Sequence, residues 1–186
     1  MIGYALTGSF CTHKASINTL KELIKTEPDI VPIMSENVYN TDTRFGKAQD
    51  LIRELEDLCH NKVIHTIKDA EPFGPARPLE MLVIAPCTGN TLAKIAHGIT
   101  DTAVTMSAKA HLRQNRKLLI ALASNDAMSA NLCNIGTLLN RKNIYFVPMK
   151  QDDILKKPHS LVADFSRLTA SFTDAMNDRQ SRPLFI

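Results

Sequence analysis

The stretch "IAPCTGNTLAKIAHGI", residues 84–99, passes directly from a strand pattern to a helix pattern. Its first residues continue the apolar run "MLVIA" (81–85), which is typical of a strand covered on both faces. Pro86 is predicted to end that strand, and Gly89 gives the backbone room before a helical segment. Strands followed by helices are the units from which parallel sheets are built, because parallel neighbours need crossover connections.

Five more short apolar runs favour strands, and segments with helical spacing lie between them. These strand candidates are residues 2–6, 30–34, 62–66, 118–123 and 144–148. The clearest helix candidate is 45–59, where apolar residues recur at positions i, i+3, i+4 and i+7. The alternation predicts an α/β fold of three layers, with a mostly parallel sheet of about six strands between two layers of helices.

Some segments are harder to place in this scheme. Pro32 and Pro148 lie inside predicted strands, where proline removes a ladder donor. Pro148 suits the end of an edge strand, whereas Pro32 has no evident place. The proline-rich stretch 71–78 is expected to form an ordered surface loop. Residues 160–177 have helical spacing and are predicted to form a C-terminal helix that docks on the sheet or on a partner subunit.

The composition is that of a globular protein, and one domain over residues 1–186 is expected. Hydrophobic residues make up 44% of the chain, and the net charge of +3 is spread without a basic block, so neither nucleic acid nor a membrane surface is an expected partner. No segment approaches the roughly 18 apolar residues of a membrane span. The four cysteines are widely spaced with no metal-ligand pattern, so we expect a cytoplasmic protein and no metal site.

Ligands of open parallel sheets bind beyond the carboxyl ends of the strands, where the strand order reverses. If the six strands take the order 3-2-1-4-5-6, the loops after the first and fourth strands flank this point. Both loops carry small polar residues ahead of a helix, which suits a phosphate but also ordinary helix capping. The residues expected at this edge are Gly8, Ser9, Thr12, Ser35, Asn90, Thr91 and 123–128, and His13 has a weaker claim.

Several motifs resemble one family of flavoproteins. "TGSFCTHK" (7–14), "APCTGNTLAKIAHGITD" (85–101) and "NIGTLL" (134–139), with Ser35 after the second strand, resemble the family that includes cysteine decarboxylases and flavin prenyltransferases. The resemblance covers nearly the whole chain and extends to members that act in dipicolinate formation in spore-forming bacteria. It implies a Rossmann-like, flavodoxin-like fold that binds FMN, a homo-oligomer built from trimers, and a location in the cytoplasm of the mother cell.

Carried over position by position, the resemblance implies a set of FMN contacts. Gly8, Ser9 and Phe10 would face the phosphate, and Ser35 the phosphate or the ribityl chain. The ribityl and isoalloxazine portions would contact Pro86, Cys87, Thr88, Asn90 and Thr91. Cys87 is interpreted as a flavin contact rather than a nucleophile. If FMN is lost on purification, a phosphate ion is expected in its place.

Two departures from the family argue against its best-known reactions. No histidine occurs between His13 and His60, where the cysteine decarboxylases carry a catalytic one, and Ser124 or Asn125 stands near the point where flavin prenyltransferases have an arginine. The resemblance instead implies a part in oxidising dihydrodipicolinate to dipicolinate, beside a second, nicotinamide-dependent polypeptide that forms the A subunit of the same enzyme. The alternatives are an FMN-dependent decarboxylase and a non-catalytic, anion-binding protein that serves in assembly.

Two residue types are candidates for contact with the substrate. Asn125 keeps the spacing of an asparagine in the decarboxylases and is expected to approach the substrate. A small dicarboxylate also calls for cations, since arginine can hold a carboxylate through two parallel hydrogen bonds. Arg44, in the loop that replaces the decarboxylase histidine, is the first candidate and Arg77 the second, with a solvated surface arginine as the alternative for both.

Overall fold

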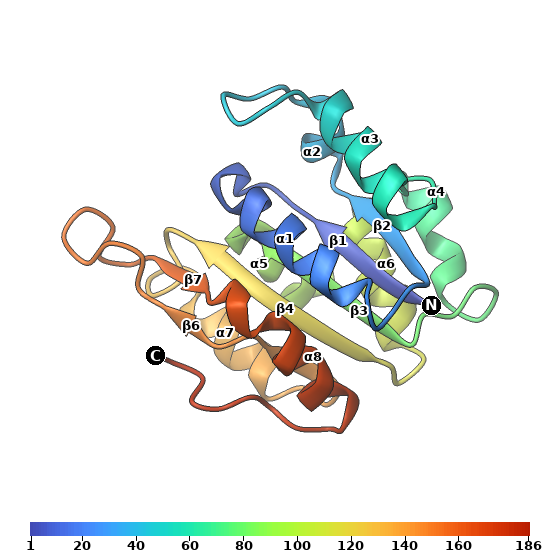
Figure 1. The fold of residues 1–186 in the computed structure, drawn as a ribbon. Helices are drawn as coiled ribbons and strands as arrows, with labels where there is room; N and C mark the ends of the chain where they lie inside the picture. Colours follow the sequence, from blue (N-terminus) through green and yellow to red (C-terminus); the bar gives the residue numbers. More distant parts are fainter.

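A seven-stranded sheet lies at the centre of the computed structural model, which describes residues 1–186 (Figure 1). The sheet order is β2-β1-β3-β4-β7-β6, and β5 also pairs with β4. The strands β1 to β5 pair in parallel, whereas β7 is antiparallel to both β4 and β6. The strands are β1 (Ile2–Leu6), β2 (Ile30–Met34), β3 (Met81–Cys87), β4 (Lys117–Ser124), β5 (Ile144–Phe146), β6 (Met149–Lys150) and β7 (Leu161–Ala163).

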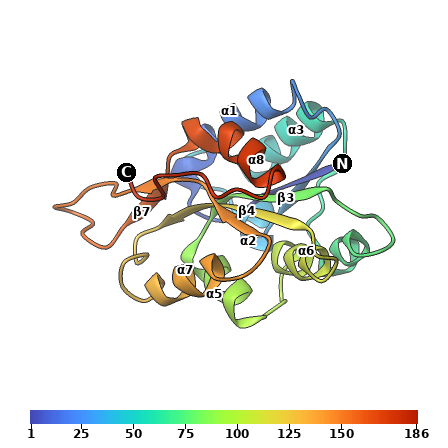
Figure 2. The ribbon, with the colours of Figure 1, turned by 90° about the horizontal axis from the view of Figure 1, so that it is seen from below.

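Helices cover both faces of the sheet and complete the predicted three-layer α/β fold (Figure 2). One layer holds α1 (His13–Leu23), α3 (Ala48–Cys59) and α8 (Leu168–Met176), and the other holds α4 (Ile67–Ala70), α5 (Gly89–His97), α6 (Ala103–Leu112) and α7 (Leu132–Leu139). A short α2 (Glu36–Asn40) follows β2, and the 3-10 turns are Phe10–Thr12, Glu71–Phe73 and Phe165–Arg167. No helix combines the length and apolar character needed to span a bilayer.

Side-chain alternation along β1 explains the two layers, because successive residues of a strand point to opposite faces. Ile2, Tyr4 and Leu6 belong to the core under α1, α3 and α8. Ala5 belongs to the core on the opposite face, with residues of α5, α6 and α7. The central strands are therefore buried on both sides, as their continuous apolar character predicts.

The predicted strand over 62–66 is wrong, and its place in the fold explains Pro32. Only Ile64 bridges the sheet, in parallel to Ile33 at the outer edge of β2. The Ile64 N–H donates to the Pro32 carbonyl at 2.9 Å, and the Met34 N–H donates to the Ile64 carbonyl at 2.8 Å. Pro32 thus turns its nitrogen toward this outer edge, where no full strand requires a donor.

Proline does not end the strand in the stretch that begins at Ile84. The strand β3 continues through a cis Ala85–Pro86 bond to Cys87, and its pairing with β4 changes register between Ile84 and Cys87. The prediction that Pro86 ends the strand is therefore wrong. The Pro86 carbonyl accepts a hydrogen bond from the Thr7 N–H at 3.2 Å, so the proline still takes part in joining β3 to the chain after β1.

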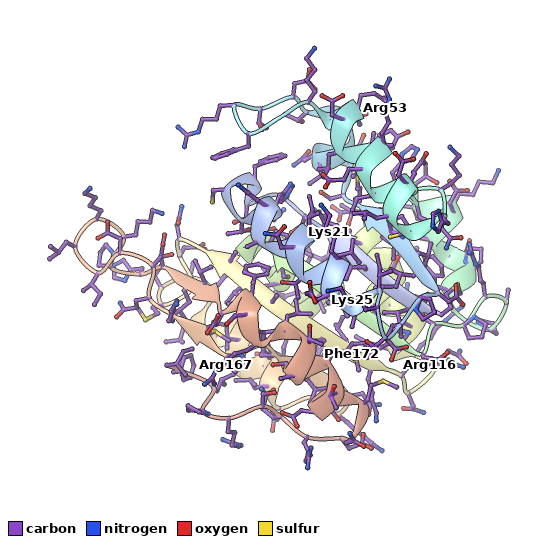
Figure 3. All side chains as sticks on the ribbon, viewed as in Figure 1. Lys21, Lys25, Arg53, Arg116, Arg167 and Phe172 are labelled. Carbon is purple, nitrogen blue, oxygen red and sulfur yellow. The ribbon has the colours of Figure 1, made fainter.

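Two predicted elements near the C-terminus are shorter in the structure. The predicted strand 144–148 is shortened to β5, which ends at Phe146, and Pro148 lies just before the separate strand β6. The predicted helix over 160–177 begins only at Leu168, because residues 161–163 pair with β4 as strand β7. The helix α8 packs on the sheet through Leu168 and Phe172, the latter labelled in Figure 3.

The strand order brings the expected loops together. With the Ile64 bridge outside β2, the six predicted strands lie in the order 3-2-1-4-5-6, and the order reverses between β1 and β3. The loops after these two strands therefore leave the sheet side by side at its carboxyl edge, where the rule for open α/β sheets expects a ligand.

His111 links α6 to the start of β4. Its side chain is fully buried, and Nε2 lies 2.7 Å from the Lys117 carbonyl, to which it donates, while Nδ1 has no partner. Burial, which disfavours the charged imidazolium, is the main reason that the pKa of His111 falls to about 4. The folded protein therefore holds this histidine neutral at pH values where the unfolded chain protonates it.

We expect acid to destabilise the protein through His111. Its contribution to the free energy of unfolding is complete above about pH 6.5 and is lost as the pH falls to about 4, a change of about 3 kcal/mol. Urea unfolding across this range measures it. His111→Gln should flatten the pH dependence, and His97→Gln, at an exposed site on α5, should not. An unchanged slope in His111→Gln would contradict this origin.

Candidate functional site

Thr7 joins the two loops at the carboxyl edge. Its hydroxyl donates to the Pro86 carbonyl at 2.8 Å and accepts from the Thr88 N–H at 2.9 Å. Gly8 allows the close approach, since a Cβ built there would lie 3.2 Å from Thr88 Cγ2. The loops after β1 and β3 therefore form the adjoining walls of one site, as the strand order predicts.

The loop after β1 presents hydrogen-bond donors that the chain does not use. The Gly8 and Ser9 N–H groups donate to no other group of the chain. Ser9 has a left-handed backbone conformation with a φ of 63°, and its carbonyl accepts from both the N–H and the hydroxyl of Thr12. The Thr12 hydroxyl is thus turned back into the loop, and the Ser9 hydroxyl has no partner in the chain.

His13 supports this loop from beneath. It is buried, and its Nε2 lies 2.9 Å from the Thr7 carbonyl. Burial lowers the pKa of His13, which keeps the ring neutral at pH 7 and makes Nε2–H the donor to that carbonyl. His13 consequently positions the loop and supplies no positive charge to a phosphate.

Ser35 contributes the most distinctive polar atom of the site. Its N–H donates to the Leu6 carbonyl at 3.0 Å, which holds the residue at the end of β2 beside the end of β1. Its Oγ is buried and has no hydrogen-bond partner. A buried hydroxyl without a partner is unusual in a native protein and calls for an explanation, such as a ligand that completes its hydrogen bonding.

Three polar residues stand at the start of α5, and two of them are used to cap the helix. Thr88 is the N-cap, and its hydroxyl accepts from the Thr91 N–H at 3.3 Å and donates to Thr91 Oγ1 at 3.1 Å. Asn90 is exposed and makes no side-chain hydrogen bond within the chain. Of these three residues, Asn90 has the side chain that is fully available to a ligand.

Cys87 and Pro86 are buried at the end of β3. The Cys87 side chain belongs to the apolar core, and burial raises the pKa of its thiol well above the usual range. A protonated, inaccessible thiol cannot act as a nucleophile, in agreement with the interpretation from sequence. Contacts from these residues to a bound group would come through the backbone.

A polar network that the sequence does not reveal faces the first residue of α5. The Asp126 carboxylate accepts hydrogen bonds from the Ser124 hydroxyl and, at 3.0 Å, from Asn131 Nδ2. The bond from Ser124 is the main reason that the pKa of Asp126 is lowered, so the group is charged at neutral pH. A Cβ built on Gly89 would lie 2.6 Å from Asn131 Nδ2 and 2.8 Å from Asp126 Oδ1, so any other residue there would displace this network. The segment 123–128 suggests Asn125 from sequence, but nothing local in it predicts that Asp126 faces Gly89.

The three proposed substrate contacts lie in different places. Asn125 is exposed on the turn after β4, at the carboxyl edge. Arg44 is exposed on the loop between α2 and α3, with its guanidinium 4.9 Å from the centre of the Phe45 ring. The chain that leads into β3, and contains Arg77, lies beside the N-terminus, where the Met1 amine pairs with Glu80 at 2.8 Å. Arg77 is therefore at the opposite edge of the sheet, and its assignment to the site is wrong.

Comparison with known proteins identifies the family. The Flavoprotein family model matches residues 1–166, and the chain belongs to this family. The B subunit of dipicolinate synthase from Bacillus subtilis (strain 168) is 40% identical over 185 residues, which span 100% of this chain and 92% of that protein. The resemblance deduced from the motifs is confirmed.

Solved structures give the same result for the fold. The crystal structure of the corresponding dipicolinate synthase B subunit from Bacillus halodurans C aligns with a TM-score of 0.91 and 37% identity, over 100% of this chain and 95% of that chain. The FMN-dependent cysteine decarboxylase SpaF aligns with a TM-score of 0.65 and 21% identity, over 94% of this chain and 95% of that chain. The latter likeness concerns the fold alone.

We expect Thr7→Val to weaken the junction of the two loops. The substitution preserves the side-chain shape but removes both hydroxyl hydrogen bonds and leaves the Thr88 N–H without its acceptor, at a cost of about 1–3 kcal/mol. Chemical denaturation measures this loss. Thr7→Ser keeps the hydroxyl and should recover most of it. Equal stability of the valine variant and the wild type would show that the bridge does not hold the loops together.

Proposed function

We propose that this chain acts as the B subunit of a dipicolinate synthase, binding FMN at the carboxyl edge of the sheet. With the A subunit of dipicolinate synthase it would take part in oxidising dihydrodipicolinate, a small dicarboxylate, to dipicolinate during sporulation. The 40% identity to the Bacillus subtilis protein over the whole chain supports the activity. The observation that carries the cofactor assignment is the buried, unpartnered Ser35 hydroxyl at the end of β2.

The polar groups of the edge fit the phosphate of FMN on one side. A phosphate offers acceptor oxygens, and the loop after β1 offers the N–H groups of Gly8 and Ser9 together with the Ser9 hydroxyl. Ser35 supplies a further donor from β2. The start of α5 is less suitable for the phosphate, because the charged Asp126 carboxylate already faces Gly89 there.

The remaining residues fit the uncharged parts of the cofactor. The Asn90 side chain is free to bind ribityl hydroxyls or the polar edge of the ring. Phe10 is half-buried at the end of the loop after β1. Backbone contacts from Pro86 and Cys87 and the capped Thr88–Thr91 pair complete this wall. FMN, when bound, supplies a ring that can accept a hydride. Asn125, exposed on the turn after β4, would approach the substrate from that side of the edge.

The residues at this edge do not fit the acid–base chemistry of the cysteine decarboxylases. The loop after β2 contains no histidine, and His13 is buried and bonded to a carbonyl, so neither supplies the acid or base of the cysteine decarboxylases. The polar residues on the turn after β4 are the exposed Asn125 and Asp126, whose carboxylate accepts hydrogen bonds within its own network.

Assembly with other chains is part of the proposed function. Residues 1–186 would work as one domain in the cytoplasm of the mother cell of a spore-forming bacterium, as a trimer or a multiple of it together with the A subunit. The loop between β6 and β7 projects from the body of the molecule (Figure 1). It exposes Ile154 and Leu155 to 66% and 92%, and burial of these adjacent aliphatic side chains would favour assembly.

We expect Ser35→Ala to lower the affinity for FMN about tenfold or more, because a hydrogen bond to a charged phosphate is lost. Fluorescence titration of the apoprotein with FMN measures this affinity. Stability should change little, since the hydroxyl has no partner within the chain. Ser171→Ala is the matched control, because Ser171 on α8 also has a buried, unpartnered hydroxyl. No FMN uptake by the wild type would refute the cofactor assignment.

The catalytic part needs a separate experiment. The FMN-loaded chain is mixed anaerobically with dihydrodipicolinate, with and without the purified A subunit, while the flavin absorbance is followed. Bleaching by the FMN-loaded chain alone would support oxidation on this chain. FMN binding without bleaching in either mixture would favour a role in assembly instead.

A further inference from the structure

A cavity of about 540 Å³ lies between α1 and the segment that runs from α2 into α3. It includes Phe10 from the loop after β1 and Val38 from α2, three residues beyond Ser35, so it adjoins the candidate flavin site. Its size is within the range of small-molecule pockets. No residue of this cavity beyond Phe10 belongs to the set assigned to FMN from the sequence.

The walls of the cavity combine apolar and polar surfaces. Ile17 of α1 and Val38 of α2 line it with almost no exposed surface, whereas Leu51 of α3 is partly exposed. Phe45 adds an aromatic ring at its border that is 55% exposed, although it is one of the largest apolar side chains in the protein. An apolar ring against Phe45 and Leu51 would remove their exposed surface from water.

The charges that remain free at the cavity are positive. Lys21 pairs with Glu54 at 2.9 Å, and Asp50 lies 3.8 Å from Arg53, so both acidic residues of the lining already face a cation. Figure 3 labels Lys21 on α1 and Arg53 on α3. The other two lysines of the lining, Lys14 on α1 and Lys47 at the start of α3, form no ion pair.

His13 is the remaining titratable group of the lining apart from Cys11. It is buried and held neutral by its environment, and its Nε2 bonds to the Thr7 carbonyl. It therefore neither opposes nor adds to the two lysines at pH 7.

We infer that this cavity binds a small cyclic dicarboxylate, with the ring against the apolar wall and the carboxylates paired with Lys14 and Lys47. The two cations come from opposite sides of the cavity, which suits a ligand with two anionic groups better than one with a single charge. The inference rests on the proposed function only in its choice of pyridine dicarboxylates as the substrate or product class.

The same geometry bears on Arg44. Thr43 and Phe45 line the cavity, but Arg44 between them does not, and its guanidinium lies over the Phe45 ring. Our inference gives the role of holding a carboxylate to Lys14 and Lys47, and Arg44, which the sequence favours, is the alternative that the variants below test.

Dipicolinate is the probe for a calorimetric titration of the purified chain. We expect Lys14→Gln and Lys47→Gln each to raise its dissociation constant about tenfold, as the loss of one charge-assisted bond implies. Lys25→Gln is the matched control, because Lys25, which is labelled in Figure 3, pairs with Glu22 and does not line the cavity. Picolinate, with one carboxylate, should bind more weakly than dipicolinate, and its affinity should fall less in the lysine variants.

Two further variants separate this cavity from its alternatives. Asn18→Trp, at an exposed position of α1 that lines the cavity, should fill it and abolish binding without changing the charge. Arg44→Gln should leave binding unchanged. Wild-type affinity in both lysine variants, no binding by the wild type, or loss of binding in Arg44→Gln alone would overturn the inference.

Parallel FMN titrations keep the two proposals distinguishable. FMN affinity should stay the same in Lys14→Gln and Lys47→Gln, whose folding is checked by thermal melting. If the chain takes up no FMN but binds dipicolinate in a way that depends on the two lysines, the cofactor assignment is refuted and dipicolinate binding in the cavity is supported. A fall in FMN affinity without a change in dipicolinate binding would assign the lysine to the flavin and overturn the inference.

Discussion

Thr7 joins the two loops on which the rest of the site depends. Its hydroxyl donates to the Pro86 carbonyl and accepts from the Thr88 N–H. Both hydrogen bonds lie at the point where the strand order reverses, between β1 and β3. Buried backbone groups require partners, so two loops that leave the sheet side by side must either bond to each other or bind water. Thr7 provides the first solution, and the two walls keep a fixed relation to each other.

Polar groups at this edge fall into those that build the protein and those that it leaves available. Thr12, Thr88 and Thr91 use their hydroxyls within the chain, and His13 uses its ring N–H on a backbone carbonyl. The Ser9 and Ser35 hydroxyls and the Asn90 side chain remain free, as do two N–H groups after β1. Residue type alone does not separate the groups, because a threonine can equally cap a helix or bind a ligand.

Electrostatics divide the carboxyl edge into regions of different character. Asp126, kept charged mainly by its bond from Ser124, places a negative charge against Gly89 at the beginning of α5. The loop after β1 carries donors without a facing carboxylate, and Lys14 and Lys47 leave unpaired positive charge at the neighbouring cavity. Anions are consequently favoured on the side of β1 and α1 and disfavoured at α5, although both helices begin at the same edge.

The sequence by itself determined the α/β class, five of the six proposed strand positions, the amphipathic helix that became α3 and the family. These features rest on local periodicity and on motifs, which act over a few residues. The sequence also located the two loops of the site through the strand-order rule. It failed where pairing partners decided the outcome: Ile64 found space for one bridge only, and residues 161–163 paired with β4 instead of continuing a helix.

Only the tertiary structure decided which of the predicted site residues keep polar groups available to a ligand. It also decided that Arg77 lies at the edge opposite the site and that Asp126 faces Gly89. It also brought Lys14 and Lys47, 33 positions apart in the chain, to one cavity. The physical reason is that hydrogen-bond satisfaction and charge pairing are properties of neighbours in space. A sequence pattern specifies the element on which a side chain stands, but the placement of α1 across the cavity from α3, and of α5 beside the turn after β4, decides what that side chain meets.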